Sequence, residues 1–269
     1  MAGNELDHTL TSEARTWGHW IEALRAGPLR SAFAHADADR LARPDSLATR
    51  WSAAVRETTW RLLLNAARER LLESSRAREC LRVELGGGAI EVPLARFGAF
   101  ELDWPMLASV EDPRIEDPLA ILELLATREG LPEADRVRVR AEIIDSIINL
   151  AQARLARELR EALARRGELG GDPRLCDPEH FVTDGHPWHP GNRTRLGLRR
   201  AEVVRYAGEQ LAHTPVGCMD VEASLARVAG AWLDEAPRWF GEATPGFVRI
   251  PIHPAQRRRI PQLFPREWA

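Results

Sequence analysis

The sequence predicts an α+β fold, with a mainly helical N-terminal part that carries a small antiparallel sheet and leads into a mixed α/β region. Apolar residues recur at three- and four-residue spacing on both sides of a short stretch in which apolar and polar residues alternate. Glycines and prolines then cluster after residue 166, where the chain changes character. We therefore expect a helical region over 1–166 and a second region over 167–269.

Composition narrows the class of protein. The chain has 269 residues and a formal net charge of -3, and no apolar stretch approaches the roughly 20 residues that cross a bilayer. Its N-terminus lacks the basic and apolar parts of a secretory signal, and three cysteines do not make a disulfide framework. We expect a cytoplasmic protein that binds neither membrane nor nucleic acid. All 37 basic residues are Arg, so any phosphate must be held by Arg, His or backbone N–H groups.

The N-terminal elements follow from apolar spacing. A small amphipathic patch around Trp17 and Leu24 predicts a short helix. A second helix is expected from Asp45-Ser46, capped by either residue, to about Leu72. Its apolar positions form one stripe: Trp51, Val55, Trp60, Leu63, Leu64 and Ala67.

The next elements change period. The segments LRVEL, AIEVPLA and FGAFELDW alternate around the glycines at 86–88 and predict an antiparallel meander. Pro118 after Asp117 suits a first helical turn, so a helix is expected over 119–127. A long helix is expected over 132–166, with this apolar stripe: Ile144, Ile147, Ile148, Ala151, Leu155, Leu159 and Leu163.

The second region is expected to hold a helix over 221–239 and a strand over 247–250 that runs into Pro251–Gln256. Before them, two His-Pro pairs lie within residues 185–190. Each proline fixes its own φ and restricts the preceding residue, so both imidazoles are presented by a stiff loop. Gly185 allows a positive φ or a close backbone approach.

The loop admits three interpretations. The first is an anion or nucleotide-phosphate site, because Arg193 and Arg195 follow the histidines and guanidinium groups suit carboxylate or phosphate. The second is a zinc site with a shell of one sulfur and three imidazoles, although the spacing of these residues matches no zinc-finger signature. Its ligands would be Cys176, His180, His186 and His189. The third is that the His-Pro pairs only cap a turn.

Two motifs in order carry a resemblance. GHPWHPGNRTRLG, residues 185–197, resembles the ATP-loop signature of the NRPS-independent siderophore (NIS) synthetases of the aerobactin synthetase, IucA/IucC type: Gly-His-Pro-any-His-Pro, two free positions, Lys, any, Arg, any, Gly. PIHPAQ, residues 251–256, resembles that family's later Pro-Val-His-Pro-Trp-Gln. IIDSIINLAQAR, residues 143–154, is similar to the helix that precedes the loop.

The departures from the pattern are specific. Arg193 stands where the family has Lys, Ala255 replaces Trp, and Asp184 precedes the loop glycine. Family members are longer, and their later Ser/Thr-Arg-Thr segment, their Mg²⁺-binding part and their palm-like part find no counterpart in these 269 residues. The resemblance implies the thumb and part of the fingers of a hand-like synthetase. A catalytically silent truncated remnant or an assembly scaffold is the alternative, and a zinc-binding module is a third.

The resemblance also implies a reaction, in which an ATP-dependent ligase activates a carboxylate such as citrate as an acyl-adenylate and condenses it with an amine or hydroxyl. His189 would contact the α-phosphate, Gly185 and His186 would shape the loop, and Arg193 and Arg195 would lie beside the phosphates. Two further residues, His253 and Gln256, would support the pocket. The implied cofactors are ATP and Mg²⁺, with the metal ligands in the C-terminal part. A second copy of the chain or a separate C-terminal half is the expected protein partner.

Overall fold

The computed structural model describes residues 2–25, 43–77, 80–85, 88–93, 117–167, 185–186, 189–198, 200–207 and 216–265. The chain divides into two compact units, Met1–Leu196 with Ala207–Leu211 and Gly197–Tyr206 with Ala212–Ala269. The expected boundary at residues 166 and 167 stays a prediction, and the contacts group the described loop residues up to Leu196 with the preceding helices. The fold class is α+β, as expected.

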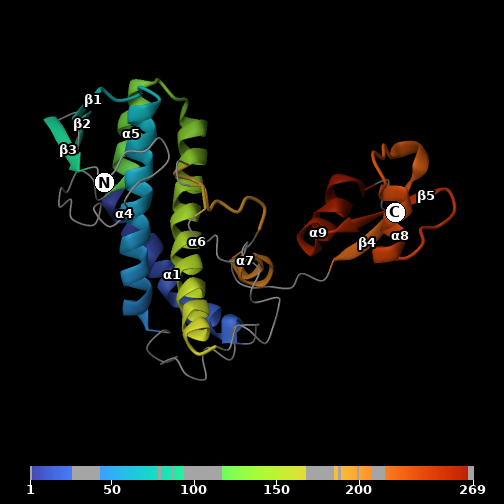
Figure 1. The fold of residues 1–269 in the computed structure, drawn as a ribbon. Helices are drawn as coiled ribbons and strands as arrows, with labels where there is room; N and C mark the ends of the chain where they lie inside the picture. Colours follow the sequence, from blue (N-terminus) through green and yellow to red (C-terminus); the bar gives the residue numbers. More distant parts are fainter. Residues whose placement is uncertain are drawn as a thin grey trace. The chain divides into compact units, whose positions relative to one another are not determined.

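Helices dominate the first unit. They are α1 (Ala2–Arg25), α4 (Pro44–Arg68), α5 (Pro118–Arg128) and α6 (Glu133–Arg165). Figure 1 shows α4 lying along α6, and α4 also contacts α1 and α5. One apolar cluster joins these four helices and includes Leu6, Trp51, Leu119 and Ile147. The predicted stripe of α6 is buried from Ile147 to Leu163, with Ile144 only partly covered, so the helix is fixed by its apolar face.

Helix boundaries follow local chemistry with one exception. Pro118 begins α5 and Asp117 caps it, since a carboxylate oxygen of Asp117 accepts the N–H of Leu119 at 2.8 Å. The expectation that Asp45 or Ser46 caps α4 is wrong. Pro44 already occupies the first turn of α4, which places both residues inside the helix, and among the described residues no side chain caps it. Helix α1 is also longer than the short helix that was expected.

A three-stranded antiparallel sheet closes one end of the helical core. Its strands β1 (Ser74–Ala77), β2 (Cys80–Leu85) and β3 (Gly88–Pro93) lie in sequence order. Val83 of β2 pairs with Ile90 of β3, and both are buried against apolar residues of α4 and α5. The antiparallel β2–β3 pair confirms the first two segments of the predicted meander. The third, FGAFELDW, lies outside the described residues and stays a prediction, and β1 was not expected.

The second unit is built on a two-stranded antiparallel sheet. Its elements are α7 (Arg200–Tyr206), β4 (Gly217–Glu222), the 3₁₀ turn η7 (Ala223–Leu225), α8 (Trp232–Phe240), β5 (Phe247–Ile252) and α9 (Pro254–Leu263). The strand predicted over 247–250 is confirmed. The helix predicted over 221–239 is wrong in its first half, because Val221 pairs with Val248 in the β4–β5 ladder and the helix begins only at Trp232. Helix α9 was not expected.

None of the helices in the described part of the chain is both long and apolar enough to span a membrane.

Candidate functional site

The His-Pro loop is held on one face of α6 by side chains that take the place of backbone partners. The hydroxyl of Ser146 donates to the carbonyl of Pro190 at 3.2 Å and accepts the backbone N–H of Arg193 at 3.1 Å. The amide of Asn149, one turn further along α6, donates to the carbonyl of Arg193 at 2.8 Å. These bonds satisfy loop backbone groups that would otherwise be buried without partners.

The same face of α6 holds the end of the loop. The carboxylate of Asp145 accepts the backbone N–H of Arg195 at 2.8 Å, and the hydroxyl of Thr194 donates to the carbonyl of Glu142 at 2.9 Å. Asp145 also accepts a bond from Asn149 at 2.8 Å, which orients that amide. Helical spacing places Glu142, Asp145 and Asn149 on one face, so a single face of α6 holds the whole loop segment from Pro190 to Arg195.

Within the loop the chain makes a compact turn. The backbone N–H of His189 donates to the carbonyl of His186 at 3.4 Å, and the side-chain amide of Asn192 donates to the same carbonyl at 3.0 Å. Gly185 has a φ of 66°, and a Cβ there would lie 2.9 Å from Nδ2 of Asn192 and 3.2 Å from Nε of Arg193. Both the left-handed backbone and the lack of space require glycine at this position.

The turn exposes two imidazoles and buries one guanidinium. His186 and His189 are exposed to solvent. Arg193 is 5% exposed and packs beneath Gly185, whereas Arg195 is half-buried. The structure therefore brings Gly185, His186, His189, Arg193 and Arg195 together in one loop. Their contacts with phosphate stay a prediction.

A buried arginine of α4 also contacts the loop. Nη1 of Arg61 donates to the carbonyl of His186 at 3.3 Å. Sequence reasoning missed Arg61, because a charged residue within an amphipathic helix gives no local signal of a contact 125 positions away. Ser146 and Asn149 were also missed, although polar residues at three-residue spacing opposite an apolar stripe could have indicated a second packed face.

The zinc site proposed for the loop includes residues outside the described part of the chain, so it stays a prediction. No group of three or more His, Cys, Asp or Glu side chains within them could hold a metal ion. Cys176 and His180, which the zinc interpretation requires, lie outside the described residues, as does Asp184.

His253 and Gln256 form the N-terminal cap of α9 in the second unit. Nδ1 of His253 accepts the backbone N–H of Ala255 at 3.1 Å, while the side chain of Gln256 accepts the backbone N–H of His253 at 3.2 Å. This reciprocal pair is a capping box in which His takes the usual place of Ser or Thr. The Tyr206 ring meets the His253 ring edge-on, with centroids 4.9 Å apart. The pocket-supporting role of the two residues stays a prediction.

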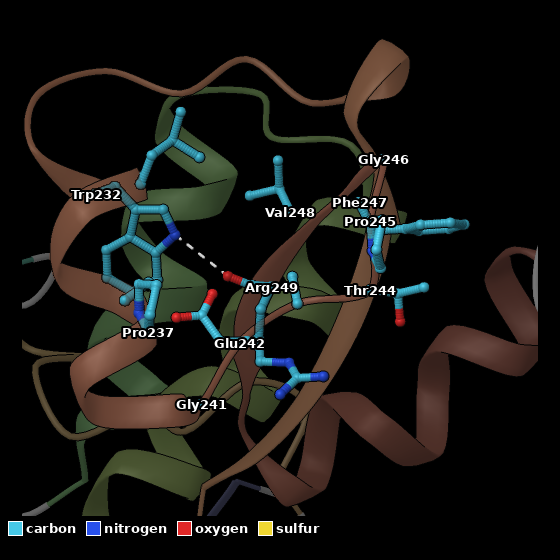
Figure 2. A pocket seen from close by; sticks show the side chains of 13 residues that line it. Trp232, Pro237, Gly241, Glu242, Thr244, Pro245, Gly246, Phe247, Val248 and Arg249 are labelled. Atoms are coloured by element: carbon cyan, nitrogen blue, oxygen red, sulfur yellow. Dashed lines mark hydrogen bonds between the residues drawn. The ribbon is translucent and has the colours of Figure 1, made fainter.

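The second unit also contains a cavity of about 230 Å³ between α8 and the loop that precedes β5 (Figure 2). The indole of Trp232 donates to the carbonyl of Arg249 at 3.2 Å across it. The guanidinium of Arg249 binds both oxygens of Asp220, Nε–Oδ1 at 2.7 Å and Nη2–Oδ2 at 3.0 Å, and Thr244 donates twice to the same carboxylate. Hydrogen bonds from Arg249, which have the larger effect, and from Thr244 hold the pKa of Asp220 far below its usual range. These polar groups bind one another, so they hold β4, β5 and the loop before β5 together.

Fold and loop together define an α+β protein whose His-Pro loop is mounted on a long helix. Residues 174–269 match the model of the IucA / IucC family, so the resemblance drawn from the motifs is confirmed over the segment that contains both. The fold is similar to that of aerobactin synthetase IucC from a hypervirulent pathotype of Klebsiella pneumoniae, with a TM-score of 0.52 and 18% identity over 80% of this chain and 42% of that chain. The chain thus spans less than half the length of that synthetase.

A second solved structure, ATP-bound aerobactin synthetase IucA from a hypervirulent pathotype of Klebsiella pneumoniae, has a TM-score of 0.48 and 17% identity over 78% of this chain and 40% of that chain. No curated protein matches the sequence.

Proposed function

We propose that this chain acts in siderophore biosynthesis and supplies the phosphate-binding loop of an ATP-dependent ligase of the NIS synthetase type. The observation that carries the proposal is the loop geometry within the IucA / IucC family segment. A turn pinned to α6 by Ser146, Asn149 and Asp145 presents the exposed imidazoles of His186 and His189 from a backbone that cannot shift easily. Preorganised donors of this kind stabilise developing negative charge without reorganisation.

The proposed first step joins two anions. A carboxylate oxygen of citrate or a related acid attacks the α-phosphorus of ATP, the bond to the bridging oxygen breaks, and pyrophosphate leaves with that electron pair. Carboxylate and phosphate repel one another until cationic or N–H donors neutralise their charge. His189 is proposed to donate to the α-phosphate, with Arg195 beside the phosphate chain and Gly185 and His186 shaping the loop.

The buried Arg193 is suited to a supporting role in this scheme. Its backbone N–H and carbonyl are both bound to α6, and its guanidinium lies below Gly185. Its positive charge, placed under the loop, favours an anion above it even without direct contact. An Arg in place of the family's Lys keeps that charge at any working pH.

In the proposed second step an amine or hydroxyl attacks the acyl carbonyl of the adenylate and loses its proton, and AMP leaves with the electrons of the acyl–phosphate bond. The products are an amide or ester and AMP. Mg²⁺ is expected to accompany ATP. No group of three or more suitable side chains lies among the described residues, and the ligands of the metal are expected in the C-terminal part of the family fold.

Titration calorimetry with Mg-ATP tests the proposal. Binding is expected for the wild type and a loss of roughly tenfold or more in affinity for His189→Ala, since hydrogen bonds to charged groups stabilise by about 1.5–3 kcal/mol. His8→Ala provides a matched control, because His8 is an exposed histidine on α1. Adding citrate is expected to increase the affinity for ATP if the two bind together.

Two results would contradict the proposal. Equal affinities of the wild type and His189→Ala would place the nucleotide elsewhere. No binding by the folded wild type would remove the nucleotide site from this chain and favour the assembly-scaffold alternative.

A further inference from the structure

The backbone carbonyl of His186 accepts hydrogen bonds from three donors, two in the loop itself and one on α4. The N–H of His189 and the side chain of Asn192 reach it from within the loop, at 3.4 and 3.0 Å. The third donor is Nη1 of Arg61, which reaches it at 3.3 Å from α4. Because the turn that carries His189 closes on this carbonyl, whatever holds the carbonyl also sets the position of His189.

Arg61 is itself held by an ionic triad in which Arg61 and Glu57 are buried and the third member, Arg154, is 24% exposed. Its side chain is 2% exposed and pairs with Glu57, one helical turn earlier on α4, whose side chain is 9% exposed. Glu57 also pairs with Arg154 of α6, so one carboxylate lies between two guanidinium groups from two helices. The triad thus ties the donor that reaches His186 to the packed α4–α6 pair.

Burial makes this arrangement stiff. A buried guanidinium is strongly destabilising unless it is paired, so Arg61 is constrained to the place where Glu57 neutralises it. The planar fork of arginine then leaves its remaining N–H groups in fixed directions, one of which meets the His186 carbonyl. A hydrogen bond from a charged donor is also stronger than one between neutral groups.

We propose that Arg61, oriented by Glu57, is a positioning residue that fixes the His186–His189 turn to the α4–α6 helix pair. It acts on the imidazoles through the backbone and needs no contact with a ligand. The effect on loop order follows from these contacts alone. The consequence for ATP affinity rests on the proposed function.

The test measures hydrogen exchange of the loop amides in the ligand-free chain. The double variant Glu57→Leu/Arg61→Met removes the two buried charges of the triad together, because replacing a buried ion pair by apolar residues of similar volume is often tolerated whereas removing one partner is not. Arg154, the third member, is 24% exposed and keeps contact with solvent when Glu57 is replaced. Exchange of the His189 amide is expected to be faster by roughly tenfold or more, while amides of α5 stay protected.

The matched control is Arg50→Met/Glu158→Gln, which removes another ion pair between α4 and α6, one in which Glu158 is exposed and Arg50 is mostly covered. Its loop exchange is expected to equal that of the wild type. Unchanged exchange in Glu57→Leu/Arg61→Met, or an equal increase in the control, would overturn the proposal.

A gentler variant covers the case in which the apolar pair prevents folding. Glu57→Gln/Arg61→Gln keeps an amide pair at i and i+4 on α4 but is too short to reach His186. Faster exchange at His189 would support the proposal, and unchanged exchange would overturn it.

ATP calorimetry on the same variants separates the two proposals. Weaker ATP binding together with faster exchange supports both. Faster exchange with unchanged ATP affinity would support the positioning role of Arg61 and contradict the assignment of ATP to this loop.

Discussion

The side-chain oxygen of Ser146 lies 3.1 Å from the backbone nitrogen of Arg193, 47 positions further along the chain, and accepts its N–H. The same hydroxyl donates to Pro190. One small polar residue, inside a helix face and fully buried, therefore bridges both sides of the turn that begins at Pro190. This contact restricts the loop in addition to its prolines.

Ser146→Ala is expected to destabilise the first unit by about 2 kcal/mol, because it removes the partner of a buried N–H and of a partly buried carbonyl. Chemical denaturation measures this as a lower midpoint with an unchanged slope. Ser52→Ala, at an exposed position of α4, is the matched control and is expected to change stability by less than about 0.5 kcal/mol. A small effect at Ser146 would show that water replaces the hydroxyl.

Gly185→Ala is expected to loosen the loop more than Gly167→Ala does. Both glycines have a positive φ, 66° and 72°, so both substitutions carry a similar backbone cost of about 1 kcal/mol. A Cβ at Gly185 also meets Asn192, whereas no atom of the described part of the chain lies within 4 Å of a Cβ at Gly167. Hydrogen exchange at His189 distinguishes them, and equal exchange in both variants would argue against close packing at Gly185.

Asp220→Asn is expected to lower the stability of the second unit at pH 7. The pKa of Asp220 is lowered in the folded protein by hydrogen bonds from Arg249 and then Thr244. A lowered pKa stabilises the fold above the unfolded value of about 3.9, and this stabilisation is lost as pH falls toward the folded value. The difference between wild type and variant in thermal unfolding is therefore expected to shrink below about pH 4.

Asp234→Asn serves as the control for that series, since Asp234 is an exposed carboxylate in the first turn of α8. A difference between the wild type and Asp220→Asn that stays constant down to pH 2 would contradict the assigned ion pair.

His253→Ala is expected to destabilise α9 by about 1 kcal/mol, because the variant loses the cap of its N-terminus. His253→Asn is expected to restore most of this stability, since Asn is a favoured N-cap residue. Hydrogen exchange of the first-turn amides of α9, Ala255 in particular, measures both variants. Failure of Asn to restore protection would mean that the ring contact with Tyr206 matters more than the cap.

The sequence was sufficient where the signal is local. The stripe from Ile147 to Leu163 and the Asp117-Pro118 start of α5 were predicted because helical spacing and helix caps involve neighbouring residues. The two His-Pro motifs also carry the resemblance to the IucA / IucC family, and residues 174–269, which contain both motifs, match that family's model.

Predictions were wrong or missing where contacts with residues distant in sequence decide the local structure. The spacing of apolar residues around Val221 predicts a helix, but Val221 pairs with Val248 in a strand. Residue spacing along the chain carries no information about a partner that far away. The cap of α4 was misplaced by two or three residues for a local reason, because Pro44 begins the helix ahead of Asp45 and Ser46 and makes Arg43 the N-cap residue.

The sequence by itself determined the α+β class, the core-facing stripes and the residues of the His-Pro loop. Only the tertiary structure decided how that loop is held: by Ser146 and Asn149 across one face of α6, and by Arg61 from α4. Spacing along the chain reports which side of a helix a residue occupies. What that side meets depends on how the helices pack, and that packing is set by contacts between residues far apart in sequence.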